Sequence, residues 1–145
     1  DVHQANGTIE IFKDRNDVLV VSTFQHPYYP NSHFWGMPDN IINIPIEAET
    51  ASTQFRRMTE RKILEGISCF KPDMIFISAG FDAHTNDPMG GLDLIEDDYY
   101  WLTRLTNSLA KTYGQGRVVS MMEGGYNLEA LALSAHEHIR ALTEV

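Results

Sequence analysis

Short apolar, β-branched runs alternate with longer amphipathic stretches along the chain, and this alternation restricts the fold more than any other feature. Helical spacing of apolar residues predicts helices from about Thr50 or Ser52 to 70, over 96–113 and over 128–142. Strands that alternate with helices are typical of an α/β fold, with a mostly parallel sheet and flanking helices. The four predicted strands are residues 18–22, 41–45, 74–79 and 118–122.

The length and composition describe one ordinary globular domain, residues 1–145. A net charge of −9 disfavours nucleic acid as a partner, and the apolar runs are too short to span a membrane. The single cysteine, Cys69, excludes an internal disulfide, and its apolar neighbours predict a buried, inert thiol. We expect a cytoplasmic protein.

Three polar clusters lie where a parallel sheet would bring side chains together. One is Asp1-Val2-His3, and the others, at 80–84 and 123–126, directly follow predicted strands. Ligands of such sheets bind at the carboxyl ends of the strands. Asp1, His3 and Asp82 would supply two carboxylates and one imidazole. Three protein ligands with an open fourth position are typical of catalytic zinc, which polarises carbonyls and acidifies water.

Tyr126 follows two glycines, which allow the backbone to turn sharply and to approach a site closely. A phenol at such a place can donate a hydrogen bond to a developing oxyanion.

Each motif also has a purely structural interpretation. An Asp after a strand, such as Asp82, is often a helix N-cap, and Gly-Gly-Tyr can be a turn with a packed aromatic ring. His84 and Asp87 can simply order their loop. The functional interpretation depends on the joint occurrence of the motifs, in order, at the carboxyl ends of strands.

The strings DVHQANGT, VVSTFQHPYYP, SAGFDAHTNDPMGG and MMEGGYN resemble the histone deacetylase family, in the class II-like bacterial branch that includes acetylpolyamine amidohydrolases. The resemblance extends over essentially the whole chain. It implies an arginase-like α/β fold and zinc-dependent hydrolysis of an acetylated amine, which would be acetyl-lysine or an acetylpolyamine.

Position by position, the resemblance also assigns roles to residues. Gln4 and Ala5 depart from the usual family pattern, which affects the expected geometry of that loop. The matching positions are Asp1, His3 and Asp82 as zinc ligands, Tyr126 as the transition-state tyrosine, Tyr29 and Met89 as walls of the substrate tunnel, Gly125 beside the acetyl group, and Ser22 and Thr23 with Asp1 and His3 as backbone ligands of a structural potassium ion.

The resemblance also implies features that this sequence lacks. Family members are much longer and carry a general-base pair of adjacent histidines before the first zinc ligand, and no adjacent histidines occur here. We expect His26, His33 and His84 to be loop histidines and not the base. In the family sheet a strand lies between the counterparts of 18–22 and 74–79, which would otherwise face each other across a gap.

The chain is therefore expected to be the carboxy-terminal part of a single deacetylase domain, with its amino-terminal half absent. Alternatively, a second copy supplies a strand in a homodimer, or the sheet closes differently.

Three functions remain open at this point. The first is a zinc-dependent deacetylase whose activity is impaired in this chain. The second is a non-catalytic, truncated deacetylase-like module that keeps the fold, with or without the metal. An arginase-type ureohydrolase ranks lower, because two-metal chemistry needs a second carboxylate where Asp82-Ala83 is followed by His84.

Overall fold

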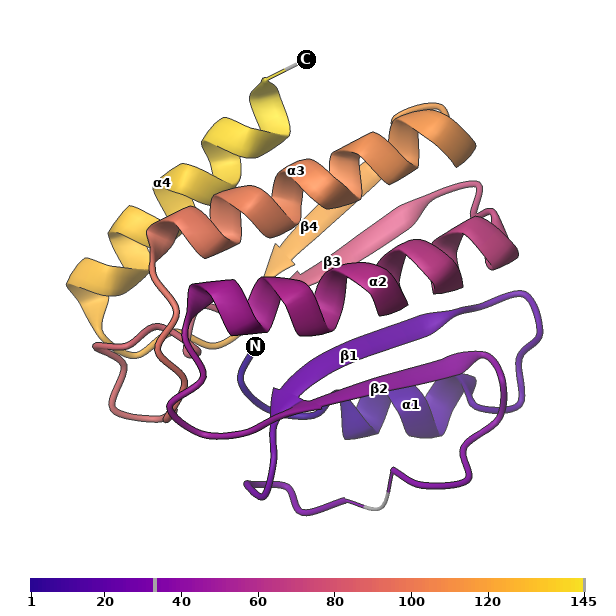
Figure 1. Cartoon of the computed structure of the whole chain (residues 1–145). Helices are drawn as coiled ribbons and strands as arrows, with labels where there is room; N and C mark the ends of the chain where they lie inside the picture. The colour runs from indigo at the N-terminus through magenta and orange to yellow at the C-terminus, as the bar shows by residue number, and fades with distance from the viewer. Residues whose placement is uncertain (33, 145) are drawn as a thin grey trace.

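The computed structural model describes residues 1–32 and 34–144, which form an α/β arrangement (Figure 1). Its elements follow the predicted alternation of strands and helices. They are α1 (Asn6–Phe12), β1 (Val20–Gln25), β2 (Ile41–Ile46), α2 (Ser52–Phe70), β3 (Ile75–Ala79), α3 (Glu96–Tyr113), β4 (Val118–Met122) and α4 (Leu128–Thr143).

The strands form two separate parallel pairs. β1 pairs with β2, with Val20 opposite Ile41, and β3 pairs with β4, with Ile75 opposite Val118. Within residues 1–32 and 34–144, β1 and β3 are not hydrogen-bonded to each other, as the predicted gap requires. In Figure 1, α2 lies across the junction between the two pairs.

Helix α2 holds the main core together through one apolar stripe. Phe55, Thr59, Ile63 and Ile67 recur every four residues and are buried, so they share one face. That face packs into a cluster with strand residues such as Ile44. Burying one aliphatic side chain of this size contributes roughly 1.5–3 kcal/mol.

Two expectations about α2 are wrong. The sequence predicts Thr50 or Ser52 as the N-cap, but the N-cap is Ala51, without a side-chain cap, and the Ser52 hydroxyl donates instead to the Asp98 carboxylate, 2.7 Å away. Cys69 is exposed, not buried. It follows Ile67 by two positions, and at 100° per residue it points away from the buried stripe.

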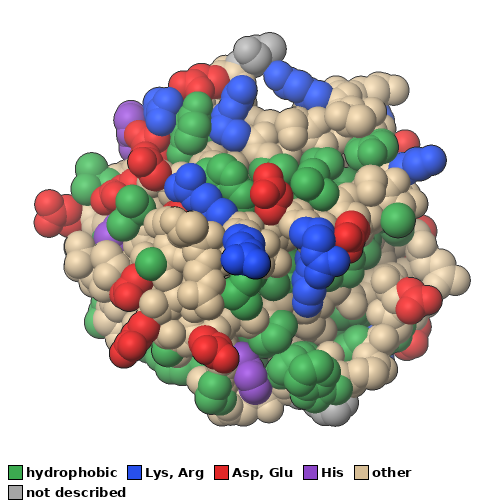
Figure 2. Space-filling model, viewed as in Figure 1, with side chains coloured by type: hydrophobic (Ala, Val, Ile, Leu, Met, Phe, Trp, Pro, Cys, Tyr) green, Lys and Arg blue, Asp and Glu red, His purple; other side chains and the backbone are tan. Residues whose placement is uncertain are grey.

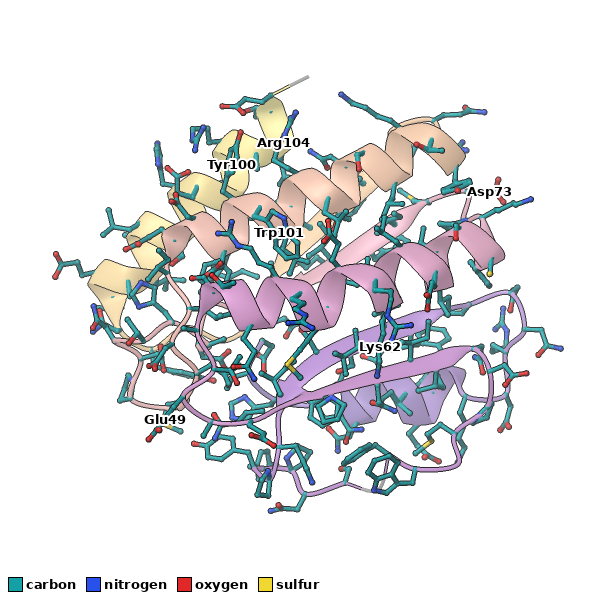
Figure 3. All side chains as sticks on the ribbon, in the orientation of Figure 1. Glu49, Lys62, Asp73, Tyr100, Trp101 and Arg104 are labelled. Carbon is teal, nitrogen blue, oxygen red and sulfur yellow. The ribbon has the colours of Figure 1, made fainter. Side chains whose placement is uncertain are left out.

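Helix α3 is fastened to α2 by aromatic packing and a buried carboxylate. Asp98, which is 1% exposed, accepts from Arg56 Nε at 2.7 Å and from the Ile95 backbone N–H at 3.0 Å. The Trp101 ring lies 6.5 Å from that of Phe55 and 5.4 Å from the Arg56 guanidinium carbon (Figure 3).

One face of the β3–β4 pair is open, although the continuous apolar run at 74–79 predicts a strand covered on both faces. Ile77 and Ala79 pack with α3 and α4 side chains in one cluster. The alternate side chains of the same strands are exposed, with Phe76 at 63% and Met121 at 54%. The described helices therefore cover this pair from a single side.

Helix α1, residues 6–12, is not among the predicted helices. Its N-cap, Ala5, makes no side-chain cap, so the usual polar start signal is missing. Ile9 is its one buried residue, and it packs with Val20 and Ile41.

Figure 2 shows acidic and basic side chains interspersed with apolar ones on the face that carries α2, without a continuous basic stripe. None of the described helices is long and apolar enough to cross a membrane.

Candidate metal centre

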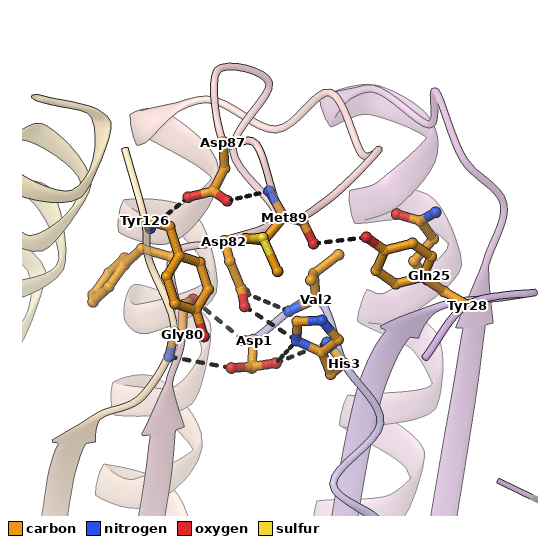
Figure 4. A network of polar contacts seen from close by, with 12 residues as sticks. Asp1, Val2, His3, Gln25, Tyr28, Gly80, Asp82, Asp87, Met89 and Tyr126 are labelled. Atoms are coloured by element: carbon orange, nitrogen blue, oxygen red, sulfur yellow. Dashed lines mark hydrogen bonds and ion pairs between the residues drawn. The ribbon is translucent and has the colours of Figure 1, made fainter. Parts of the chain in front are cut away.

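Asp1, His3 and Asp82 converge at the carboxyl ends of β1 and β3 (Figure 4). His3 Nδ1 lies 2.9 Å from Asp1 Oδ1 and 3.2 Å from Asp82 Oδ2. One ligand atom from each of the three residues lies within 4.8 Å of the other two. The sequence-predicted ligand set is therefore brought together in space, although it comes from opposite parts of the chain.

Backbone hydrogen bonds place the first ligands between the two strand pairs. The Asp1 nitrogen donates to the Gly80 carbonyl, 3.2 Å away, and the Gln25 N–H donates to the Val2 carbonyl, 2.9 Å away. Gly80 directly follows β3, and Gln25 ends β1. The segment thus pairs on both sides, and Val2, with no exposed surface, anchors it in the core.

The donor set fits a divalent cation. Asp82 has no exposed surface, and its Oδ1 accepts from the Val2 N–H at 2.6 Å, while its Oδ2 has no hydrogen-bond partner. A buried charged oxygen without a partner is costly unless a cation compensates it. Two carboxylates and one imidazole suit zinc.

The Gly124 backbone closes the other side of the cluster. A Cβ at this position would lie 2.2 Å from Asp82 Oδ2 and 2.8 Å from Asp1 Oδ2, so any side chain here would collide with the carboxylates. The Gly124 N–H also donates to Asp1 Oδ2 at 3.2 Å. Next to it, Gly125 has φ +140°, and a Cβ there would lie 2.9 Å from the Leu131 side chain. The turn before Tyr126 therefore requires both glycines.

Aromatic rings surround His3. The Tyr29 ring meets it edge-on at a centroid distance of 5.8 Å, and the Tyr28 ring is stacked on it at 5.7 Å. The Tyr28 hydroxyl donates to the Met89 carbonyl at 3.1 Å. Sequence reasoning missed Tyr28, although its place beside Tyr29 in an aromatic, proline-rich loop was an available signal.

The predicted tunnel and oxyanion residues lie on loops around this centre with accessible side chains. Tyr29 is 68% exposed, Tyr126 54% and Met89 47%. All three can therefore be reached by a solute, which their predicted roles require.

Two of the residues predicted to bind potassium, Ser22 and Thr23, lie on β1. Ser22 Oγ accepts the Ala5 N–H at 3.1 Å, so this side chain contacts the segment that follows His3. Thr23 pairs with Ile44 across the strands. The departure at Gln4 is accommodated in the interior, where its Nε2 donates to Asn43 Oδ1 at 2.9 Å. Potassium binding stays a prediction.

The described histidines other than His3 are engaged elsewhere. His84 Nδ1 accepts the Asn86 N–H at 3.0 Å, and its Nε2 faces Glu96 Oε1 at 3.3 Å. His26 packs edge-on against Phe34. His136 lies on the surface of α4, His138 bonds to Thr103 and Ser120, and His33 lies outside the described residues.

Comparison with known proteins places this geometry in a family. The histone deacetylase domain matches residues 1–142. The chain belongs to the histone deacetylase family. Its fold accordingly agrees with solved deacetylases: the HDA15 HD domain gives a TM-score of 0.88 at 32% identity over 98% of this chain. The acetylpolyamine aminohydrolase of Burkholderia pseudomallei gives 0.83 at 27% identity over 98%.

Curated members of the histone deacetylase family are similar over nearly the whole chain. Type-2 histone deacetylase 2 of Dictyostelium discoideum is 36% identical over 99% of it, and histone deacetylase 14, chloroplastic, of Arabidopsis thaliana is 36% identical over 98%. The chain spans 9% and 35% of the lengths of these two relatives, and 42% of each of the two solved chains. The family and fold are thereby established, while substrate and activity are matters for proposal.

Proposed function

We propose that this domain hydrolyses an acetylated amine, acetyl-lysine or an acetylpolyamine, with a zinc ion held by Asp1, His3 and Asp82. The observation that supports this most strongly is the convergence of the three ligand atoms around the buried Asp82 Oδ2, which accepts no hydrogen bond. One of the similar solved proteins is an acetylpolyamine aminohydrolase, which agrees with this substrate class.

When bound, zinc would supply Lewis acidity toward the amide carbonyl and would lower the pKa of the attacking water. The chain's own residues would do the rest. The Tyr126 phenol would donate a hydrogen bond to the developing oxyanion, and the Gly124–Gly125 turn would let the substrate carbonyl approach closely. Tyr29 and Met89 would line the tunnel that holds the chain of the substrate amine, and Gly125 would lie beside the acetyl group.

The described histidines do not supply a clear general base for the proton-transfer step. Among them, His84 and His138 are hydrogen-bonded within the fold, and His26 packs against phenylalanine rings. General acid–base catalysis usually contributes about 10²–10⁴-fold. We therefore propose that the 145-residue polypeptide by itself turns over substrate more slowly, by about this factor, than a deacetylase that carries the general-base histidine pair. A deacetylase-like module that binds metal without turnover is the alternative, and the same observation favours it.

A potassium ion would bind near Ser22, Thr23 and the Asp1–His3 segment and would stiffen it. The strand pairs would be joined by further chain of the same protein, or by a second copy in a homodimer. The proposed compartment is the cytoplasm, and a fluorescent fusion would test this, since the Arabidopsis relative is named chloroplastic.

Zinc stoichiometry and amide hydrolysis, measured on the same preparation, test the proposal. We expect one zinc per chain, and hydrolysis of a fluorogenic acetyl-lysine peptide or of acetylated polyamines by the full-length protein. Asp82→Asn should lose both, whereas Asp93→Asn, the same change at an exposed position in the same loop, should keep both. Zinc without hydrolysis by the full-length protein would support the non-catalytic module, and absence of zinc would refute the zinc-dependent hydrolase.

A further inference from the structure

Asp87 is a buried carboxylate, 6% exposed, whose hydrogen bonds all come from the backbone of two separate loops. Its Oδ2 accepts from the N–H groups of Tyr126, at 2.7 Å, and Asn127, at 3.1 Å. Its Oδ1 accepts from the Met89 N–H at 2.8 Å. In Figure 4, Asp87 stands between Tyr126 and Met89, with a dashed line to each.

These bonds tie the loop after β3 to the start of α4. Asn127 is the N-cap of α4, and its side chain accepts from the Ala130 N–H. The Asn127 Nδ2 also donates to the Asn86 carbonyl at 3.0 Å. Bonds from backbone N–H groups to a carboxylate are stronger than neutral ones, and the amino end of a helix favours negative charge. The two loops are therefore held at a fixed spacing.

We propose that Asp87 is a positioning residue, which sets the place of the Tyr126 phenol relative to the Met89 wall of the substrate site. The inference rests on the proposed function for the roles of Tyr126 and Met89. It goes further in assigning their mutual placement to one carboxylate that touches neither substrate nor metal.

The surroundings leave this task largely to Asp87. The Tyr126 side chain is half-exposed and so is weakly fixed by packing, and the preceding Gly125, at φ +140°, allows more backbone freedom than other residues do. Met89 is held at its carbonyl by Tyr28 and at its N–H by Asp87. An oxyanion donor must lie about 2.7–3.1 Å from the developing charge, so a small shift of the turn removes its contribution.

Asp87→Asn in the full-length, zinc-loaded protein tests the proposal. Asparagine offers one oxygen, and its NH2 group faces a backbone donor, so at least one of the three bonds is lost. We expect kcat for the acetyl-lysine peptide to fall about 10- to 100-fold, with zinc stoichiometry unchanged. Asp93→Asn, in the same loop but exposed, should keep kcat within about 2-fold.

A double-mutant cycle separates positioning from general destabilisation. If Asp87 acts through the phenol, Asp87→Asn should lower kcat less than about 3-fold further in a Tyr126→Phe background. If Asp87→Asn lowers kcat by the same factor in the Tyr126→Phe background as in the unsubstituted protein, the proposal is overturned.

Amide hydrogen exchange provides a readout that does not need activity. In Asp87→Asn, the N–H groups of Tyr126, Asn127 or Met89 should exchange at least about 10-fold faster than in the unsubstituted protein, while strand amides such as Val119 keep their protection. Unchanged exchange at all three would overturn the role of Asp87. Should the full-length protein prove inactive, the proposed function fails, and exchange still decides whether Asp87 fixes the two loops.

Discussion

Replacing Gly124 by alanine should destroy the metal centre without unfolding the domain. The added Cβ would lie 2.2 Å from Asp82 Oδ2 and 2.8 Å from Asp1 Oδ2, whereas real Cβ atoms keep at least 3.0 Å. The first contact therefore requires a displacement of about 0.8 Å, and the second about 0.2 Å, both at ligand atoms of the proposed site.

The size of the effect follows from the tolerance of metal coordination. Productive metal–ligand distances hold within about ±0.2 Å, so the Asp82 displacement is about four times larger than the site can absorb. We expect zinc affinity to fall at least 100-fold, which corresponds to about 2.8 kcal/mol at 1.4 kcal/mol per tenfold.

Competition with a fluorescent zinc chelator would measure the affinity, and far-UV circular dichroism of the metal-free proteins would check the fold. Gly7→Ala is the matched control, because nothing lies within 4 Å of its Cβ. Gly7 is in helix α1, where alanine should stabilise by roughly 0.5–1 kcal/mol and leave zinc binding unchanged. Zinc binding by Gly124→Ala at the unsubstituted affinity would refute the placement of the carboxylates against this turn.

Three other substitutions probe the chemistry and the fold. Tyr126→Phe should lower kcat of the full-length protein about 10²–10³-fold without changing zinc affinity, since it removes an oxyanion donor but no ligand; an effect confined to KM would contradict that role. Asp98→Ala should lower the free energy of unfolding in urea by about 1–3 kcal/mol, because the Ile95 N–H and the half-buried Arg56 lose their acceptor; no measurable loss would contradict this role of Asp98. Burial lowers the pKa of His138, so the unfolded chain binds the extra proton first and stability falls as pH drops below about 6.5. As the pH falls below about 6.5, the free energy of unfolding of the unsubstituted protein should decrease by up to about 1.4 kcal/mol per pH unit more than that of His138→Gln. Parallel curves of unfolding free energy against pH for the two proteins would rule the effect out.

Patterns of short range were enough to predict most elements of the fold. The boundaries of α3 and β4 agree with prediction because apolar spacing and a helix-ending glycine, Gly114, coincide there. The expected N-cap of α2 was wrong because the Ser52 side chain bonds to Asp98, 46 positions away, and no local rule describes such a partner. Helix α1 was missed because its start carries no polar cap.

Some residues of the candidate site could be predicted from the sequence and others could not. Asp1, His3 and Asp82 could be grouped from sequence because strand ends of a parallel sheet share one rim. Asp87 was expected only to order its own loop, because its bonds to the N–H groups of Met89 and Tyr126 leave no signature in the pattern of side chains. The aromatic loop offered a signal for Tyr28, but the contact of this residue with the Met89 carbonyl is equally invisible in the sequence.

The Asp1–Val2 segment pairs with the end of β3 on one side and the end of β1 on the other, and this has a thermodynamic consequence. Asp82 follows β3, whereas Asp1 and His3 belong to the segment between the two pairs, so an ion held by all three would couple the separate sheets. Linkage makes such coupling reciprocal: whatever changes the spacing of the sheets must change metal affinity by the same factor that the metal changes the spacing equilibrium. The zinc affinity of this domain would then report on how firmly its two strand pairs are joined.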